Sequence, residues 1–263
     1  MTKRDTAKGR PTVRFAALGD LHCTKTSQGN YQSLFAAVNE AADALLLCGD
    51  LTDYGLPEEA QVLARELAAV RVPVVAVLGN HDYESGQQDA VREVLQGVGV
   101  TVLDGEAIEI HGVGIAGAKG FAGGFGRFTL GSWGEAAIKS FVREALDEAL
   151  KLEAALARLR TPQSIALLHY APIRDTVEGE PAEIMAFLGN SRLEEPLQRH
   201  PVSAVLHGHA HGGSPEGRTV SGVPVYNVSM PVMNRHFPDQ PPFRVLALEV
   251  EPSGEPAAGG VMP

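Results

Sequence analysis

The sequence predicts an α/β fold with a parallel sheet, because three short apolar runs recur at even intervals and each leads into a polar residue. The runs are 13–18, 44–48 and 72–78. Buried strands of a parallel sheet are continuous apolar segments of this kind. Asp20, Asp50 and Asn80 follow the runs at intervals of thirty residues. A strand–helix–strand unit takes roughly 30 residues or more, so all three side chains should return to one edge of the sheet.

Helical patterns connect these runs, as parallel strands require. Residues 30–42 place apolar side chains on one face, as a helix that covers a sheet does. Pro57 begins a second predicted helix, because proline is tolerated in the first turn and the acidic residues after it suit the positive helix end. Ser85 and Gln88 have the spacing of a capping box and predict a third helix.

The pattern changes after residue 99. Short strands are expected as a meander that continues the sheet system, at 100–103, 107–110 and 113–116. A glycine-rich loop follows at 117–128. Ser132 and Glu135 again have capping-box spacing, and an apolar stripe predicts one long helix over 134–159.

Four more strands are expected in the last hundred residues. The first two, at 164–168 and 202–206, again end at polar residues. The last two, at 224–228 and 243–250, are expected to close a second sheet. We find no internal repeats.

Length and composition favour one domain over 11–250, with tails at 1–10 and 251–263, because the 263 residues are 44% hydrophobic. The net charge of -10 argues against a nucleic-acid or membrane surface, which would need a basic face. Cys23 and Cys48 cannot form a disulfide framework and are expected to be small buried thiols. The chain begins without the apolar segment of a signal peptide, so a cytoplasmic location is expected.

Residues that can bind metal ions stand at the ends of the predicted strands. They are Asp20, His22, Asp50, Asn80, His169, His209 and His211. Carboxylate, amide and imidazole ligands without thiolate suit divalent transition-metal ions such as Mn, Fe, Zn or Co. Seven ligands are too many for one such ion. If Asp50 bridges, two ions roughly 3.5 to 4 Å apart can each take four ligands, as a two-metal phosphoesterase requires.

Five sequence blocks occur in order: Asp-x-His, Gly-Asp-x-x-Asp, Gly-Asn-His-Asp, His and Gly-His-x-His. In these blocks the chain resembles the calcineurin-like metallophosphoesterase family. The resemblance implies a two-sheet α/β sandwich with helices on the outer faces. It also implies two metal sites: Asp20, His22, Asp50 and His211 for one ion, and Asp50, Asn80, His169 and His209 for the other.

The resemblance further implies catalytic roles for Asp53 and His81. Asp53 stands where the family places a carboxylate that orients the histidine of the Gly-Asn-His block, which is His81. A hydroxide that bridges both ions would attack phosphorus in line, and the ions and His81 would stabilise the equatorial oxygens. His81 would then protonate the departing oxygen.

Two departures from the family pattern narrow the range of expected substrates. Members that act on phosphoproteins carry arginine where this chain has Tyr54, which argues against protein phosphatase activity. The block around Asp50 looks more like the branch that includes bacterial cyclic-nucleotide phosphodiesterases, but Tyr170 replaces a histidine that these often have. We expect a metal-dependent phosphoric ester hydrolase, and specifically a phosphodiesterase acting on a small phosphate ester.

Other functions remain open from the sequence. A phosphomonoesterase or nucleotidase could use the same two-metal site. A non-catalytic scaffold would usually have lost ligands, and none is missing; a nuclease would need a basic groove. Substrate contacts are expected from Asn80, His81, Tyr170 and Arg192. The loop 117–128 is either a flexible connector or a substrate lid, and His207 is expected to be packed and not a ligand.

Overall fold

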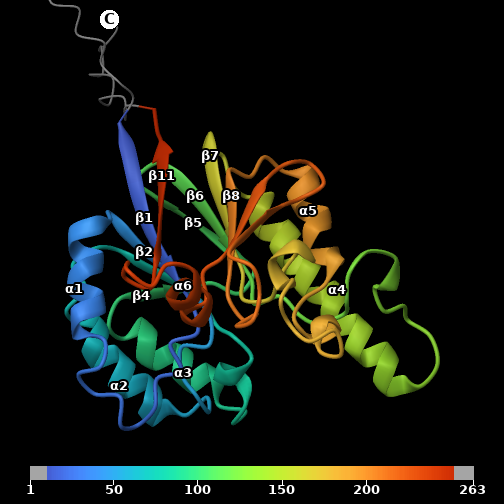
Figure 1. Cartoon of the computed structure of the whole chain (residues 1–263), viewed down its shortest axis with the longest axis horizontal. Coiled ribbons are helices and arrows are strands. Elements are labelled where there is room, and N and C mark those ends of the chain that lie inside the picture. The colour runs from blue at the N-terminus through green and yellow to red at the C-terminus, as the bar shows by residue number, and fades with distance from the viewer. Residues whose placement is uncertain (1–10, 252–263) are drawn as a thin grey trace, which may run out of the picture.

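The computed structural model describes residues 11–251, and the predicted tails at 1–10 and 251–263 lie outside these residues apart from residue 251. Two mixed β-sheets pack against each other, and helices cover their outer faces (Figure 1). Buried apolar side chains from both sheets fill the space between them, among them Leu46, Ile115 and Ile165. The predicted two-sheet α/β sandwich is therefore confirmed.

The first sheet contains the strands that the thirty-residue interval predicted. Its parallel strands are β1 (Thr12–Leu18), β2 (Ala44–Cys48), β3 (Val74–Val77) and β4 (Val100–Val102). The connecting helices are α1 (Gln32–Ala41), α2 (Pro57–Leu67) and α3 (Gln88–Gln96), whose apolar residues pack on the sheet. Because these strands are parallel, β1, β2 and β3 end at the same edge.

The second sheet has the strand order β5–β6–β7–β8–β10–β9. Its strands are β5 (Glu106–Ile110), β6 (Val113–Gly117), β7 (Gln163–Leu167), β8 (Ala204–His207), β9 (Glu216–Arg218) and β10 (Pro224–Asn227). The long helix α4 (Ala136–Leu156) and the short α5 (Glu194–Arg199) lie on its outer side (Figure 1). A further short helix, α6 (Met230–His236), follows β10.

Two predicted strand placements are wrong. The strands near 100–116 do not form one meander, because β4 pairs with β3 in the first sheet while β5 and β6 form an antiparallel hairpin in the second. The last strand, β11 (Arg244–Glu249), pairs antiparallel with β1 and does not close the second sheet. Its side chains alternate between half-buried and exposed, which suits an antiparallel edge strand but does not identify the sheet it joins.

Both predicted capping boxes are also wrong. Helix α3 begins after Gln87 without a side-chain cap, and the Ser85 hydroxyl instead donates to Gly55 O at 2.6 Å. Helix α4 begins after Glu135, again without a side-chain cap. Ser85 therefore connects the loop after β3 to the loop after β2, a long-range contact that local spacing cannot reveal.

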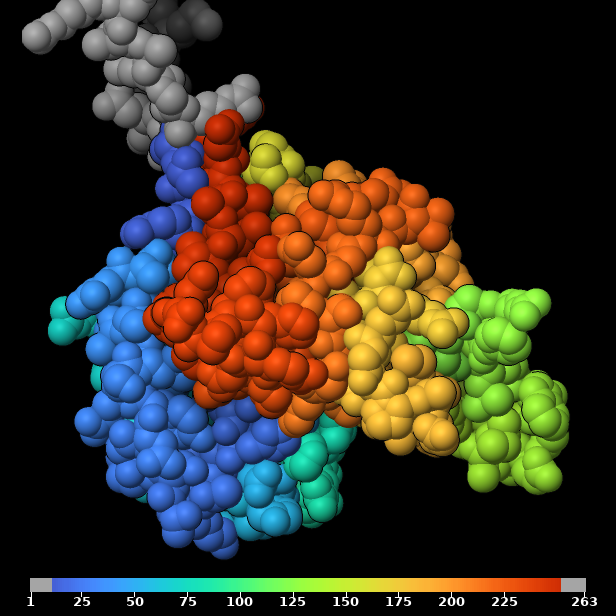
Figure 2. Space-filling view, in the orientation of Figure 1, coloured from blue at the N-terminus to red at the C-terminus, as the bar shows by residue number. Residues whose placement is uncertain are grey.

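The two sheets are joined at the edge where their parallel strands end. Gly19 N, beyond β1, donates to Val228 O, beyond β10, at 3.0 Å. Figure 2 shows the segment around 170–190, in gold, on the same face as α6 and β11, in red, with the segment before α4 projecting to one side in light green. Within residues 11–251, none of the helices is both long enough and apolar enough to cross a membrane.

Candidate active site

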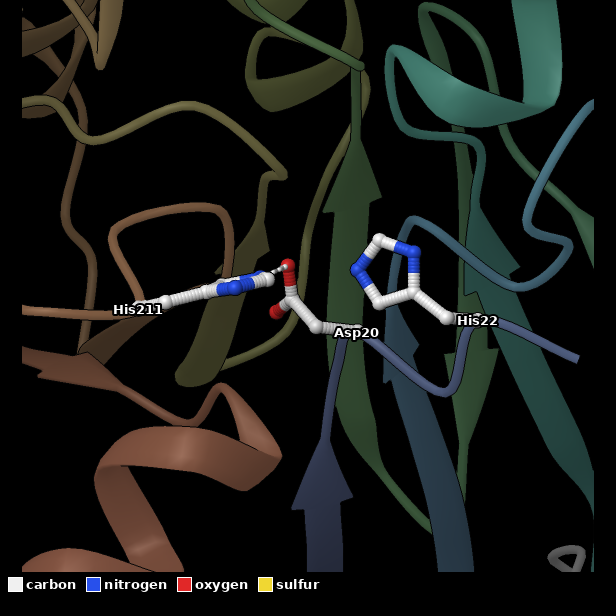
Figure 3. Close-up of side chains that lie close together, drawn as sticks. All are labelled: Asp20, His22 and His211. Carbon is white, nitrogen blue, oxygen red and sulfur yellow. Dashed lines mark hydrogen bonds and ion pairs between the residues drawn. The ribbon is translucent and has the colours of Figure 1, made fainter.

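The strand ends bring the predicted metal ligands together in two groups. Asp20, His22 and His211 form the first group (Figure 3), and Asp50, His169 and His209 form the second. In each group, one potential ligand atom of every residue lies within 4.8 Å of the others. Asn80, the remaining predicted ligand, places its Oδ1 2.9 Å from His169 Nε2. All seven predicted ligands thus lie in one region, although they come from both sheets.

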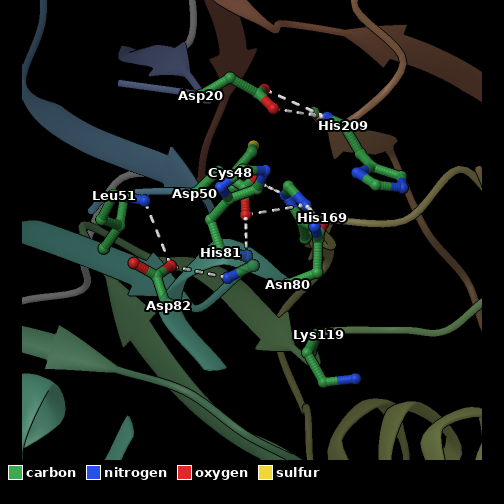
Figure 4. Close-up of polar contacts among 12 residues, drawn as sticks. Asp20, Cys48, Asp50, Leu51, Asn80, His81, Asp82, Lys119, His169 and His209 are labelled. Atoms are coloured by element: carbon green, nitrogen blue, oxygen red, sulfur yellow. Dashed lines mark hydrogen bonds and ion pairs between the residues drawn. The ribbon is translucent and has the colours of Figure 1, made fainter. Parts of the chain in front are cut away.

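Asp50 lies between the two groups. Its Oδ1 is 3.3 Å from His169 Nε2 (Figure 4), and its Oδ2 is 3.9 Å from His22 Nε2. Asp50 Oδ2 and His22 Nε2 are both buried and have no hydrogen-bond partner in the described part of the chain. Buried polar atoms are normally paired, because leaving them unpaired costs free energy. A carboxylate oxygen and an imidazole nitrogen left facing each other in this way fit a divalent cation bound between them.

Main-chain carbonyls fix the orientation of two imidazoles in the second group. His169 Nδ1 donates to Cys48 O at 2.8 Å, which leaves Nε2 to face Asp50 and Asn80. His209 Nε2 donates to Phe187 O at 3.2 Å, which leaves Nδ1 free. Such acceptors orient metal-binding histidines, so each ring directs its other nitrogen toward the site, where a bound ion could take it as a ligand.

The Asp53 carboxylate contacts His22, and its expected role in orienting His81 stays a prediction. Asp53 Oδ1 lies 3.2 Å from His22 Nδ1, whereas His81 Nδ1 donates to the main-chain carbonyl of Asp53 at 2.7 Å. The His22 and His81 rings are 4.6 Å apart, so both histidines lie within reach of one short side chain. Sequence position alone could not tell which of the two it would meet.

His81 is also held through its backbone. His81 N donates to Asp50 Oδ1 at 2.9 Å, and with Nδ1 bound to Asp53 O its Nε2 is left for other contacts. The ring therefore stands beside the carboxylate shared by both groups.

Backbone conformation supports a functional role for the region where the ligand-bearing strands end. Of the described residues other than glycine, five have positive φ, and four of these are predicted metal ligands: Asp20, His22, Asp50 and His209. Such conformations cost free energy outside glycine and concentrate at functional sites. Glycines permit the close packing around them, because a Cβ at Gly79 would collide with Asp50 Oδ1 and one at Gly208 with Asp20 Oδ2.

Asp82 is a buried residue whose role the sequence did not indicate. It accepts hydrogen bonds from Thr52 N at 2.8 Å, Thr52 Oγ1 at 2.6 Å, Leu51 N at 3.2 Å and Gly79 N at 2.8 Å. Burial, and then the nearby charge of Asp50, raise the pKa of this carboxyl. Asp82 connects the loops that carry Asp50 and His81 (Figure 4). In the sequence, only its position at the end of the Gly-Asn-His-Asp block could have indicated this role.

The charges of Asp50 and His169 depend on each other. Burial disfavours both charged forms, but the two groups are only 3.3 Å apart. The Asp50 carboxylate consequently raises the pKa of His169 to about 9. In return, His169 holds the pKa of Asp50 far below its ordinary value. Without a metal ion, this pair is a buried ion pair.

The predicted substrate residues have different surroundings. The Tyr170 ring lies 4.4 Å from the His209 ring, at the edge of the second group. The Arg192 guanidinium donates to Leu130 O at 2.7 Å, and its contact with substrate stays a prediction. The loop 117–128 is fastened to a neighbouring segment, since Gly123 N donates to Ala186 O at 2.8 Å.

The expected burial of His207 and of the two cysteines is confirmed. His207 is fully buried and its Nε2 lies 2.8 Å from Thr176 Oγ1, so it is packed. Burial lowers the pKa of His207 to about 4. Cys23 and Cys48 are buried free thiols, and burial raises the pKa of Cys23 to about 11.

The comparisons with known proteins agree with this geometry. The model of the calcineurin-like phosphoesterase family matches residues 13–213. A probable cyclic nucleotide phosphodiesterase of Synechococcus sp. is 26% identical over 268 residues, or 95% of this chain and 92% of that protein. The glycerophosphodiester phosphodiesterase GpdQ of Enterobacter lignolyticus is 42% identical over 45 residues, 17% of this chain and 16% of that protein. The phosphopantetheinyl hydrolase of Mycobacterium tuberculosis has a similar fold, with a TM-score of 0.64 and 15% identity over 95% of this chain and 99% of that one.

We predict that Asp53→Asn weakens metal binding in the group of Asp20, His22 and His211 by about tenfold, a usual effect of losing such a supporting contact. The substitution removes the carboxylate at His22 Nδ1 but keeps the main-chain carbonyl that holds His81. Titration calorimetry with Mn²⁺ would measure both affinities. Asp43→Asn, a change in an exposed pair with Arg14, is the control. Unchanged affinity in Asp53→Asn would contradict the contact with His22.

We also predict that metal affinity rises with pH up to about 9 and then levels. In the metal-free protein the raised pKa keeps a proton on His169 below that pH, and a bound ion must displace it. Calorimetry near neutral pH, in buffers of different ionisation enthalpy, should therefore detect proton release. Absence of proton release on binding to the second group would show that His169 is neutral in the metal-free protein.

Proposed function

The chain belongs to the calcineurin-like phosphoesterase family, and we propose that it is a metal-dependent phosphodiesterase acting on a small phosphate ester. The observation that carries the proposal is the position of Asp50. One of its carboxylate oxygens faces His169 and the other faces His22, so a single side chain belongs to both ligand groups. A two-metal phosphoesterase needs such a shared ligand.

The ligand types support transition-metal ions as cofactors. Asp20, His22, Asp50 and His211 would hold one ion, and Asp50, Asn80, His169 and His209 the other. Carboxylate, amide and imidazole donors suit Mn, Fe, Zn or Co. Ions bound there would activate water and neutralise charge on the phosphoryl group. Positive charge at the site would attract phosphate despite the net charge of -10.

Three observations support a diester over a monoester. Tyr54, which stands where phosphoprotein-directed members carry arginine, is 55% exposed and offers no cation to a dianionic monoester. The guanidinium of Arg235 donates to the main-chain carbonyls of His211, a predicted ligand, and of Gly212. The names of the two relatives, a cyclic nucleotide phosphodiesterase and a glycerophosphodiester phosphodiesterase, support the same choice. Tyr170, in place of a histidine, argues against assuming a cyclic nucleotide.

His81 is proposed as the proton donor to the leaving group. Its N and Nδ1 are both held by main-chain and carboxylate acceptors, so the ring has one orientation and directs Nε2 away from Asp53 O. A ring fixed beside Asp50 can deliver a proton to an oxygen departing from phosphorus. Asp53 contributes through its carbonyl, while its side chain orients His22. Asn80 and Tyr170 are proposed to contact the substrate.

The diester preference predicts a higher specificity constant for bis-(para-nitrophenyl) phosphate than for para-nitrophenyl phosphate. Both substrates release the same leaving group, so the comparison isolates the charge on phosphorus. The assay uses protein loaded with Mn²⁺ and, in parallel, with Zn²⁺. A clear preference for the monoester would favour a phosphomonoesterase or nucleotidase instead. No hydrolysis by the fully loaded protein would favour the scaffold.

The general-acid role predicts that His81→Ala slows nucleoside or alkyl diesters roughly 100-fold more than nitrophenyl diesters, the usual scale of general acid catalysis. An alkoxide needs a proton to depart and nitrophenolate does not. His111→Ala, an exposed histidine on the β5–β6 turn, serves as the control. Metal content is measured in each variant. Equal losses on both substrate types at full occupancy would mean that His81 stabilises the phosphoryl oxygens instead.

A further inference from the structure

Lys119 is a buried lysine at the end of β6, beside the ligand groups but outside them. It is 7% exposed, and its Nζ donates to Gly120 O at 2.8 Å. The nearest carboxylate is that of Glu148 on α4, 4.0 Å away. Lysine is rarely buried to this extent without a compensating partner, because removing its charge from water is costly.

Three aromatic rings surround the Lys119 ammonium. The distance from Nζ to the ring centroid is 5.0 Å for Phe121, 5.4 Å for Tyr83 and 5.5 Å for Tyr170. A cation within about 6 Å of a ring face is attracted to it, and more strongly where water is excluded. The ammonium is therefore held by rings as well as by a carbonyl.

Tyr170 connects this cation to the ligand groups. Its ring lies 4.4 Å from the ring of His209 and 5.4 Å from that of His169. The carbonyl of Lys119 also accepts hydrogen bonds from His169 N at 3.0 Å and from Tyr170 N at 3.1 Å. Lys119 thus holds the segment that carries His169 through its main chain and through its side chain.

An ion network anchors Lys119 to the helix behind it. Glu148, which is 1% exposed, accepts from Gly120 N at 2.8 Å and from Lys151 Nζ at 2.7 Å. Lys151 also donates to Asp104 at 2.9 Å, between β4 and β5. The Lys119 side chain points away from the ligand cluster in Figure 4, so it is placed to support the cluster and not to touch the substrate.

We propose that Lys119 is a positioning residue. Its ammonium keeps the Tyr170 ring in contact with the rings of His169 and His209, and so orients these two imidazoles for the ion that they would bind with Asp50. The proposal rests on the proposed two-metal function. It also gives a role to the tyrosine at position 170, because the Lys119 ammonium among the three aromatic rings fixes the position of the Tyr170 ring.

Lys119→Met tests the proposal, because methionine fills similar space without the charge. The probe is Mn²⁺, and binding is measured by titration calorimetry in two backgrounds. The first background is His211→Ala, which should leave the group of Asp50, His169 and His209 intact. The second background is His209→Ala, which should leave the group of Asp20, His22 and His211 intact. We expect Lys119→Met to weaken Mn²⁺ binding about tenfold in the first background and to leave it unchanged in the second.

Three further single variants and one double variant separate positioning from general stability. Lys139→Met changes an exposed lysine on α4 outside this network and should leave Mn²⁺ binding unchanged. Tyr170→Leu should weaken binding as Lys119→Met does, and the double variant should lose little more than either one, because both act through the same contact. Tyr170→Phe keeps the ring and should bind as the wild type does.

Several outcomes would overturn the proposal. Equal losses in the two backgrounds would indicate a general effect on the fold. Unchanged binding in Lys119→Met, with two ions bound to the wild type, would overturn the role of Lys119 alone. Failure of the wild type to bind any Mn²⁺ or Zn²⁺ would overturn the two-metal function, and this inference with it.

Discussion

One buried carboxylate shared by two groups of imidazoles is the constraint on which the rest of the site depends. Asp50 is 1% exposed, has positive φ, and directs one oxygen toward His169 and the other toward His22. Burial alone would favour its neutral form, so nearby positive charge is needed to keep it ionised. In the metal-free protein His169 supplies it on one side. On the other side Asp50 Oδ2 and His22 Nε2 remain unpaired within the described chain, as expected where a cation binds.

The surroundings of Asp50 are arranged mainly through backbone groups. Cys48 O orients His169, Phe187 O orients His209, and Asp53 O orients His81. Carbonyls on strands and fastened loops cannot turn as side chains do, so they fix these rings more firmly. The carbonyls come from β2, from the loop after β2 and from the segment between β7 and β8, so the site depends on both halves of the sandwich. A distortion at the sheet interface should therefore reach the site directly.

The sequence predicted the parts of this arrangement that depend on local pattern. Apolar runs ending in Asp20, Asp50 and Asn80 identified the parallel strands and the ligand-bearing edge, and the family resemblance supplied the second sheet. The sheet that β4 and β11 would join was not predictable, because strand pairing depends on which edge is free in three dimensions. The same applies to the partner of the Asp53 carboxylate and to the burial of Lys119, since both are set by side-chain packing between distant segments.

The most direct test of the shared carboxylate is the metal stoichiometry of the wild type, Asp50→Asn and His209→Ala, measured by elemental analysis after equilibration with Mn²⁺ and removal of free ion. If Asp50 belongs to both groups, the wild type binds two ions per chain, Asp50→Asn loses affinity at both sites together, and His209→Ala loses it mainly at one. A single ion in the fully loaded wild type, or loss at only one site in Asp50→Asn, would contradict this account.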